Sequence, residues 1–327
     1  MTAPHTAESA GTAAGTAAET ALLEVDGLRV TFNAPAGPVR AVRGVSLHVR
    51  PGEILGVAGE SGCGKSVLFR ALLGLLPATA GVEGAMRFDG EPMGMDGTLQ
   101  AASALVYQNP GAALNPVFTI GQQLQFAAGT RDPEILCDLL AQAGLSEPEQ
   151  LLDAYPHEFS GGMSQRAVIA LALAQKPRLL IADEPTTALD VTTQSQVLDL
   201  IAELRDRHHL AVVLISHDLA VIRQVCNRVV VLYAGQVAET GATARVLAAP
   251  GHPYTQALLA SVPRSEAVGT ELYSIPGQVP DGRHEISGCA FAPRCPHAHD
   301  VCRADQPALR PLGTGHDAAC VLVEPPR

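Results

Sequence analysis

The sequence predicts an α/β protein with a parallel core sheet, an antiparallel β subdomain and a helical subdomain, followed by a small, irregular, cysteine-rich C-terminal appendage. Three observations lead to this fold class. Two runs of alternating apolar and polar residues come first, continuous apolar runs then alternate with helical patterns, and periodicity fades after about residue 250. The expected division is a disordered tail over 1–20, a main domain over 21–250 with a helical subdomain at about 108–175, and an appendage over 251–327.

The first elements follow the tail. MTAPHTAESAGTAAGTAAET has low complexity and lacks the apolar block of a secretion signal. LLEVDGLRVTF and VRAVRGVSLHVR then alternate, which is typical of half-buried antiparallel strands. EILGVAG is a nearly continuous apolar run and indicates a central parallel strand covered on both faces. GKSVLFRALLGLLP has helical spacing until Pro77 ends it.

Helices dominate the middle of the chain. ILCDLLAQAGL and QRAVIALALAQ have helical patterns, and no strong strand signal occurs between about 108 and 175. Strand character returns in LLIAD and AVVLISH, which flank the helical stretch TTQSQVLDLIAELRDRHH. RVVVLYAGQVAETG then indicates a strand and a hairpin.

Composition narrows the function classes. The net charge of -11 over 327 residues argues against a chain that coats nucleic acid. The longest apolar candidate, AVIALALAQKPRLLIAD, is interrupted by Lys176, Pro177 and Arg178, so we expect no membrane span. We therefore expect a cytoplasmic protein whose membrane role, if it has one, depends on a partner.

Residues 59–66 read GESGCGKS, which fits the phosphate-binding pattern G-x-x-x-x-G-K-[ST]. The pattern follows a predicted strand and begins a predicted helix, so a chance glycine-rich turn is disfavoured. Its glycines allow successive backbone N–H groups to point at phosphate oxygens, and the helix start adds a favourable dipole. Lys65 would reach the β- and γ-phosphates of ATP, and Ser66 would ligate Mg²⁺. The expected nucleotide-contacting residues are Gly59, Glu60, Ser61, Gly62, Cys63, Gly64, Lys65, Ser66 and Val67.

Two carboxylates end the buried run LLIADE at 179–184. Asp183 is expected to hold Mg²⁺ through water, and Glu184 to polarise the attacking water as a general base. Paired acids at the end of a strand also occur in ordinary loops, so this pattern gains weight only beside the phosphate-binding loop.

FSGGMSQR at 159–166 resembles the signature motif of ABC ATPases, and its place upstream of LLIADE matches that family. PTTALD resembles the family's D-loop, with Asp190 as its acid. Gln108 in LVYQNP resembles the Q-loop glutamine, a catalytic-site residue and Mg²⁺ ligand, and His217 in LISHD resembles the switch histidine. Phe32 stands where the family stacks an aromatic ring on adenine, although an ordinary strand aromatic fits equally well. The implied fold is a P-loop NTPase of the ABC type.

The resemblance implies that ATP is held between two subunits. Ser160, Gly161 and Gly162 place a hydroxyl and N–H groups at the start of a helix, which makes an anion cradle. In the family this cradle faces the γ-phosphate held by a second ATPase subunit. Met163 replaces the usual glutamine and Ser164 stands where a basic residue is common, which leaves the tuning of the partner's site in doubt.

Other segments resemble the ATP-binding subunits of dipeptide and oligopeptide importers. They are YPHEFSGGM, NPGAALNP, HPYTQALLASVP at 252–263, and the tail GCAFAPRCPHAHDVC with PAL and HDAAC. The resemblance implies a second, related ATPase in a heterodimer, two transmembrane permeases and an extracytoplasmic peptide-binding protein, with this chain peripheral on the cytoplasmic face. Nickel chelates and other peptide-like solutes remain open as cargo.

Two other classes of ABC ATPase are alternatives to a peptide importer. Soluble ABC ATPases of DNA repair or translation often carry two ATPase units or a long coiled-coil insertion, and exporter ATPases are often fused to a membrane domain. The sequence shows none of these features.

Cysteines gather in the C-terminal appendage. Cys289, Cys295, Cys302 and Cys320 are separated by five, six and seventeen residues. Four cysteines are able to hold a 4Fe–4S cluster or a tetrahedral Zn²⁺. The lack of a C-x-x-C pair weakens the zinc interpretation, the resemblance favours the iron–sulfur cluster, and reduced or disulfide-bonded cysteines remain open. The histidines nearby are interpreted as solvated loop residues: His297, His299 and His316.

Overall fold

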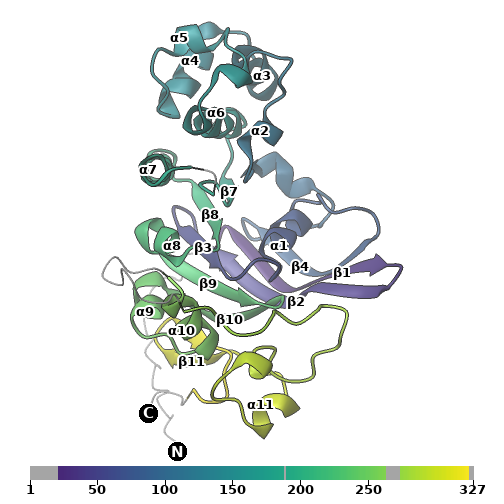
Figure 1. Ribbon diagram of the computed structural model, residues 1–327. Helices are drawn as coiled ribbons and strands as arrows, with labels where there is room; N and C mark the ends of the chain where they lie inside the picture. Colours follow the sequence, from purple (N-terminus) through teal and green to yellow (C-terminus); the bar gives the residue numbers. More distant parts are fainter. Residues whose placement is uncertain (1–20, 188, 263–272, 324–327) are drawn as a thin grey trace, which may run out of the picture.

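The structure, a computed structural model, describes residues 21–187, 189–262 and 273–323. The tail over 1–20, expected to be disordered, lies outside the described residues. Two sheets and a separate group of helices make up the described part (Figure 1). Among the described residues, no helix has both the length and the apolar character needed to cross a bilayer.

The smaller sheet is antiparallel and has the strand order β2-β1-β4-β5. Its strands are β1 Leu23–Ala34, β2 Gly37–Val49, β4 Ala80–Phe88 and β5 Glu91–Met93. The buried and exposed residues of β1 alternate along its first half, as expected of a strand that covers a core on one face. The two alternating runs at the start of the chain are thus confirmed as an antiparallel pair.

The larger sheet has the order β11-β12-β10-β9-β3-β8-β7-β6. Its central strands are parallel: β3 Ile54–Ala58, β6 Ser103–Val106, β7 Leu179–Asp183, β8 Ala211–Ser216 and β9 Arg228–Tyr233. Every residue of β3, β7 and β8 is buried, which explains their continuous apolar runs. β10, Gln236–Ala242, pairs antiparallel with β9 and forms the predicted hairpin.

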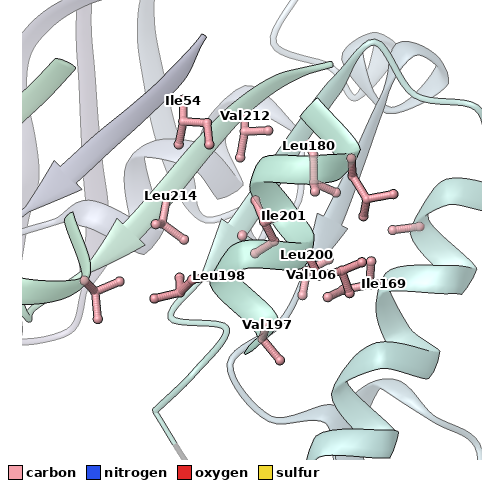
Figure 2. Close-up of a cluster of buried hydrophobic side chains, with 14 of the residues drawn as sticks. Ile54, Val106, Ile169, Leu180, Val197, Leu198, Leu200, Ile201, Val212 and Leu214 are labelled. Carbon is pink, nitrogen blue, oxygen red and sulfur yellow. The ribbon is translucent and has the colours of Figure 1, made fainter. Parts of the chain in front are cut away.

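Helices cover the parallel strands. α1, Lys65–Leu72, follows β3. It ends earlier than the predicted stop at Pro77, because Gly74 takes a φ of 63° that turns the chain. α7, Val191–His208, connects β7 to β8, and α8, Leu219–Val225, connects β8 to β9. Figure 2 shows the core between the central strands and α7, where buried side chains from both elements meet: Ile54, Leu180, Val212 and Leu214 with Val197, Leu198 and Ile201.

A group of helices stands apart from the sheets, at the top of Figure 1. It contains α2 Pro110–Ala113, α3 Ile120–Ala128, α4 Pro133–Gln142, α5 Pro148–Leu151 and α6 Gly161–Ala174, with a 3₁₀ turn at Pro156–Glu158. Another 3₁₀ turn, Thr98–Ala102, precedes β6. Thr119 begins α3 with a reciprocal capping box to Gln122, so local sequence sets this helix start.

The C-terminal segment joins the larger sheet. α9 Thr243–Ala248 and α10 Pro253–Ala260 follow β10, and a 3₁₀ turn Ala292–Arg294 and α11 Asp300–Ala304 come later. β11 Arg310–Gly313 and β12 His316–Ala318 then add to the edge strand β10. The segment is irregular, as expected, but its last strands extend the core sheet rather than forming a sheet of their own.

Candidate functional site

The sequence motifs meet at one edge of the larger sheet. The phosphate-binding loop follows β3, Gln108 follows β6, Glu184 follows β7 and His217 follows β8. These strands are parallel neighbours in the order β3-β8-β7-β6, so their carboxyl ends lie at the same edge. Ligands of open parallel sheets bind at that edge, which is where the sequence predicted the ATP site.

The phosphate-binding loop takes a backbone that only glycine adopts easily. Gly59, Gly62 and Gly64 have φ values of 149°, 81° and 101°. A Cβ on Gly59 would collide with the carbonyl oxygen of Leu232, and one on Gly64 would lie 2.5 Å from that of Ala41. The loop therefore wraps closely enough to aim backbone N–H groups inward at the start of α1, which fits a phosphate chain.

Lys65 lies along the inside of this loop and is 5% exposed. Its Nζ donates to the carbonyl oxygens of Gly59 at 2.7 Å and Glu60 at 3.0 Å. A buried ammonium needs such partners. The loop therefore holds the lysine in place, and its N–H groups together with the lysine's positive charge suit a triphosphate.

Ser66 and Asp183, two of the predicted Mg²⁺ residues, are in contact. The Ser66 hydroxyl donates to Asp183 Oδ1 at 2.9 Å, and Arg70 Nη2 lies 4.0 Å from Oδ2. Burial raises the pKa of Asp183, because a desolvated carboxylate lacks sufficient compensating charge. A hydroxyl and a carboxylate are oxygen ligands that Mg²⁺ prefers, and a cation would offset the burial. This pair therefore fits the predicted metal.

The three predicted catalytic residues form one cluster around the Glu184 carboxylate. Gln108 Nε2 donates to Glu184 Oε2 at 3.1 Å, and His217 Nδ1 lies 3.1 Å from Oε1. Thr187, which the sequence did not single out, donates to Oε2 at 2.9 Å. The Glu184 side chain is 14% exposed and the His217 side chain 51% exposed. The hydrogen-bonded Glu184 carboxylate thus lies at the same sheet edge as the phosphate loop, and the cluster is open to solvent at His217.

The signature residues belong to a different part of the fold. Ser160 caps α6 by accepting from the N–H of Met163 at 3.3 Å, and Gly161 and Gly162 form the first turn. A Cβ on Gly162 would lie 2.6 Å from Cγ2 of Thr193, so the start of α6 packs closely on α7. The signature hydroxyl and glycines therefore lie at a helix N-terminus, as predicted, but outside the cluster around Glu184.

Asp190 begins α7. Its Oδ1 accepts from the N–H groups of Thr192 and Thr193, and its Oδ2 from the Thr193 hydroxyl at 2.6 Å. The Thr193 hydroxyl and N–H hold the pKa of Asp190 below its ordinary value. Capping alone accounts for aspartate at this position. Ala188, in the same PTTALD motif, lies outside the described residues.

Phe32 lies near the end of β1 and is half-buried. It is the register partner of Val39 on β2 and Ala80 on β4, and it packs against the core beneath this sheet. Both interpretations of Phe32, adenine contact and ordinary strand aromatic, fit this position.

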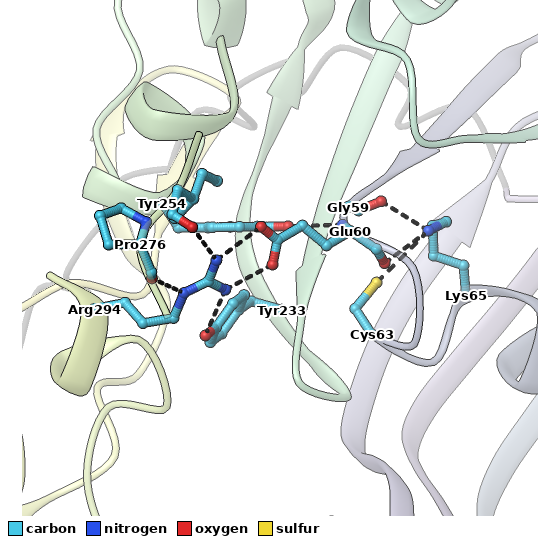
Figure 3. Close-up of polar contacts among 9 residues, drawn as sticks. Gly59, Glu60, Cys63, Lys65, Tyr233, Tyr254, Pro276 and Arg294 are labelled. Atoms are coloured by element: carbon cyan, nitrogen blue, oxygen red, sulfur yellow. Dashed lines mark hydrogen bonds and ion pairs between the residues drawn. The ribbon is translucent and has the colours of Figure 1, made fainter. Parts of the chain in front are cut away.

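Two residues of the C-terminal part contact the phosphate loop, and the sequence did not single them out as site residues. Arg294 makes a bidentate ion pair with Glu60, and the hydroxyl of Tyr254 accepts from the N–H of Glu60 (Figure 3). Arg294 stands 234 residues from Glu60, so no motif spacing connects them.

The cysteine-rich segment does not form the predicted metal centre. All four cysteines are free thiols around an apolar cavity of about 10 Å³, lined with Phe291, Pro307 and Leu322. Burial raises the pKa of the Cys289, Cys295 and Cys320 thiols. Within the described part of the chain, no three His, Cys, Asp or Glu side chains form a group that could hold a metal ion. The 4Fe–4S prediction is therefore wrong, and the zinc alternative is not supported either.

One histidine prediction is also wrong. His316 is 6% exposed, and its Nε2 lies 2.7 Å from Oε1 of the fully buried Glu239. It is thus a buried hydrogen-bonding partner of Glu239 rather than a solvated loop residue. His297 and His299 are exposed, as expected.

Comparison with known proteins supports the interpretation of this site as an ATP-binding site. Residues 42–187 match the family described as ABC transporter, and residues 238–302 match the oligopeptide/dipeptide transporter C-terminal region. The dipeptide transport ATP-binding protein DppD of Escherichia coli K12 is 44% identical over 92% of this chain and 96% of its own. The oligopeptide transport ATP-binding protein OppD of Salmonella typhimurium is 42% identical over 91% and 94%.

Among solved structures, the dimeric ATP-binding cassette MJ0796, bound to ADP and phosphate, is similar with a TM-score of 0.58 and 25% identity. The likeness covers 68% of this chain and 98% of that one. The phosphate loop, the Glu184 cluster and the identity over nearly the whole chain lead to one conclusion: this protein belongs to the ATP-binding subunits of ABC transporters, in the dipeptide and oligopeptide transport group, and hydrolyses ATP for a transporter.

Proposed function

We propose that this chain powers the uptake of dipeptides or oligopeptides, as one of two ATPases beneath a pair of membrane permeases. The observation that carries the proposal is the gathering of Gln108, Glu184 and His217 at the sheet edge that also holds the phosphate loop. The peptide cargo is supported by relatives whose names specify dipeptide and oligopeptide transport.

Each residue has a role that its surroundings support. Glu184 accepts a proton from the attacking water, and Gln108 and His217 orient that water and carboxylate. Lys65 holds the terminal phosphates. Ser66, Asp183 and Gln108 would hold Mg²⁺, which would supply positive charge against the phosphates when bound.

ATP binds between two subunits in this proposal. Ser160, Gly161 and Gly162 complete the ATP site of a second, related ATPase rather than the site of their own chain. Two facts support this: these residues begin α6, outside the Glu184 cluster, and a similar cassette is known as a dimer. Asp190, at the start of the neighbouring α7, contributes to the same contact surface.

The remaining partners follow from the transport group. We propose two transmembrane permeases and an extracytoplasmic peptide-binding protein, with this chain peripheral on the cytoplasmic side and without nucleic acid. The proposed division keeps an ATPase domain over 21–250, with helices at about 108–175, and a C-terminal region over 251–327.

Uptake of a labelled dipeptide by intact cells tests the proposal. Cells in which Lys65→Ala replaces the native chain should lose most of the uptake, because the phosphates lose their lysine. Arg207→Ala is the matched control, since Arg207 is an exposed basic residue at the end of α7. The tagged chain, extracted from membranes in mild detergent, should bring two hydrophobic permeases with it. Normal dipeptide uptake in the Lys65→Ala cells would show that the cargo is something else.

A further inference from the structure

The C-terminal segment contacts the phosphate loop at Glu60. Arg294, just before Cys295, places Nη1 2.6 Å from Glu60 Oε2 and Nη2 3.0 Å from Oε1. The arginine side chain is 5% exposed and that of Glu60 23% exposed. A bidentate, largely desolvated pair of this kind is both strong and directional.

Arg294 is itself fixed by its own segment. Its Nε donates to the carbonyl oxygen of Pro276 at 2.7 Å, Nη2 to that of Ile275 at 3.2 Å and Nη1 to the Tyr233 hydroxyl at 3.2 Å. Its guanidinium also lies over the ring of Phe291, 5.9 Å from the centroid. The arginine therefore has one orientation, set by residues that belong to the C-terminal segment and β9.

Tyr254 of α10 holds the same loop residue by its backbone. Its hydroxyl accepts from the N–H of Glu60 at 2.8 Å, and its ring is fully buried against Tyr233, with centroids 4.5 Å apart. Glu60 is thus anchored by its side chain and by its main chain to parts of the protein beyond residue 250 (Figure 3).

The anchored residue also contacts the phosphate-binding lysine. The carbonyl oxygen of Glu60 accepts from Lys65 Nζ at 3.0 Å, and the neighbouring carbonyl of Gly59 accepts at 2.7 Å. A continuous chain of contacts therefore leads from Arg294 through Glu60 to Lys65. The pair has a second electrostatic consequence, because Arg294 neutralises a carboxylate that stands in a loop built for an anion.

We propose that Arg294 is a positioning residue of the ATP site: by holding and neutralising Glu60, it fixes the loop from which Lys65 binds phosphates, so that the C-terminal segment sets ATP affinity. Arg294 does not touch the nucleotide in this proposal. It acts only through Glu60, and the inference depends on ATP binding and not on the identity of the transported solute.

Loss of the arginine charge should weaken ATP binding more than it slows chemistry. In Arg294→Gln the Glu60 carboxylate loses both charged bonds, repels the triphosphate and competes for Lys65. We expect the Kd and KM for Mg-ATP to rise about tenfold, within the ordinary range of coupling between sites, while kcat changes less than about threefold. Arg294→Lys keeps the charge but not the fork, and should restore most of the affinity.

A double variant distinguishes an effect of Arg294 on ATP binding from a purely structural role. Arg294→Gln combined with Glu60→Gln no longer carries an unpaired carboxylate, so it should bind Mg-ATP more tightly than Arg294→Gln alone. Titration calorimetry of the full-length chain gives the affinities, and steady-state hydrolysis by the assembled transporter gives KM and kcat. Arg303→Gln is the matched control, because Arg303 forms an exposed pair with Asp300 in the same segment.

The midpoint of thermal unfolding reports any folding defect, independently of the ATP-binding measurement. If Arg294→Gln lowers the midpoint but leaves the Mg-ATP affinity within about twofold of the wild type, Arg294 is only a structural tie and the proposal fails. Should Arg294→Gln fail to fold, Tyr254→Phe gives the answer, because it removes only the acceptor for the Glu60 N–H and keeps the ring. Weaker ATP binding by Tyr254→Phe supports the proposal, and unchanged binding by Tyr254→Phe overturns it.

Discussion

At the scale of single residues, the backbone of Glu184 explains how its carboxylate reaches the site. Glu184 has a φ of 49°, an uncommon value for a residue other than glycine. Its N–H donates to the carbonyl of Ile215 at 3.0 Å, which ties the turn after β7 to the end of β8. Strained positions of this kind concentrate at functional sites, and here the turn directs the carboxylate towards Gln108 and His217.

Glu184→Gln should stop hydrolysis while ATP still binds. Glutamine keeps an acceptor for Thr187 but cannot take a proton from water. The loss of a general base typically costs about 10²–10⁴ in rate. Phosphate release by the assembled transporter measures turnover, and nucleotide titration should show a Kd within about threefold of the wild type.

Glu203→Gln is the control for this change, since Glu203 is an exposed glutamate on α7. The assignment of Glu184 as the base would be wrong if turnover by the Glu184→Gln transporter stayed near that of Glu203→Gln.

The sequence identified most of these residues by motif, but not their contacts. Asp183, Glu184 and His217 stand directly at strand ends, where an apolar run followed by a polar residue is visible. Thr187 carries no such signal, because threonine in a turn is ordinary. Arg294 could not be found from the sequence either, since its partner Glu60 is brought to it only by tertiary folding.

At the scale of secondary-structure elements, length decided what the sequence could predict. β3, β7 and β8 are buried runs of five or six residues between clear turn signals, so their patterns stand out. β11 and β12 have four and three residues and are strands only because β10 offers a partner edge. Such strands have no periodicity of their own, so pairing and not local pattern creates them.

The contact between the two sheets contains a titratable element. His48, near the end of β2, places Nε2 2.9 Å from Nη1 of Arg228 at the start of β9. Arg228 also pairs with Glu53 at 3.0 Å. Burial, with the charges of Arg228 and Arg50, lowers the pKa of His48 to about 4. Arg245 and Asp317 are the other charged groups of this pocket.

The free energy of unfolding should therefore fall as pH falls from about 6.5 to about 4. In this window the unfolded chain protonates His48 whereas the folded chain does not, so acid favours unfolding. A shift of this size corresponds to about 3 kcal/mol for a fully desolvated group, and partial exposure of His48 reduces the effect to about 1 kcal/mol.

His48→Gln keeps an acceptor for Arg228 and removes the titrating group. It should therefore reduce the fall in the free energy of unfolding between pH 6.5 and 4 by about 1 kcal/mol. Denaturant unfolding at pH 6.5, 5.5 and 4.5 measures it. His284→Gln, at an exposed position, serves as the control. Equal pH dependence of His48→Gln and the control would contradict the assignment.

At the scale of the whole molecule, the C-terminal segment packs against both sheets and contacts the phosphate loop. Its strands β11 and β12 extend the larger sheet, and the N–H of Arg40 on β2 donates to the carbonyl of Gly282 at 2.9 Å. The buried Glu239 of β10 accepts from the N–H groups of Gly251 and His252 and pairs with His316. The sequence predicted an irregular appendage because apolar periodicity fades there, whereas these polar contacts and buried side chains such as Tyr254 and Phe291 join it to the core.

The signature cradle and the phosphate loop of one chain should serve different ATP molecules in the assembled dimer. Ser160→Asp tests this because aspartate still caps α6, so folding is preserved, while its charge repels a γ-phosphate. In a dimer with one such subunit, trapping of photolabelled nucleotide should fall at least about tenfold at the partner's loop, comparable to the loss of one anion-binding donor, and much less at its own. Lys65→Ala should do the reverse.

Thr119→Ala is the matched control for this experiment, because it removes a helix cap in the same group of helices without touching the signature. It should leave trapping at both sites near the wild-type level, which separates loss of a cap from loss of the cradle. If the cradle acts in trans, Ser160 and Lys65 of one chain contact two different nucleotides, so each variant should leave one site loaded. Loss of trapping only at the variant's own loop would show that the cradle acts within a single chain, and equal loss at both loops would contradict the trans assignment.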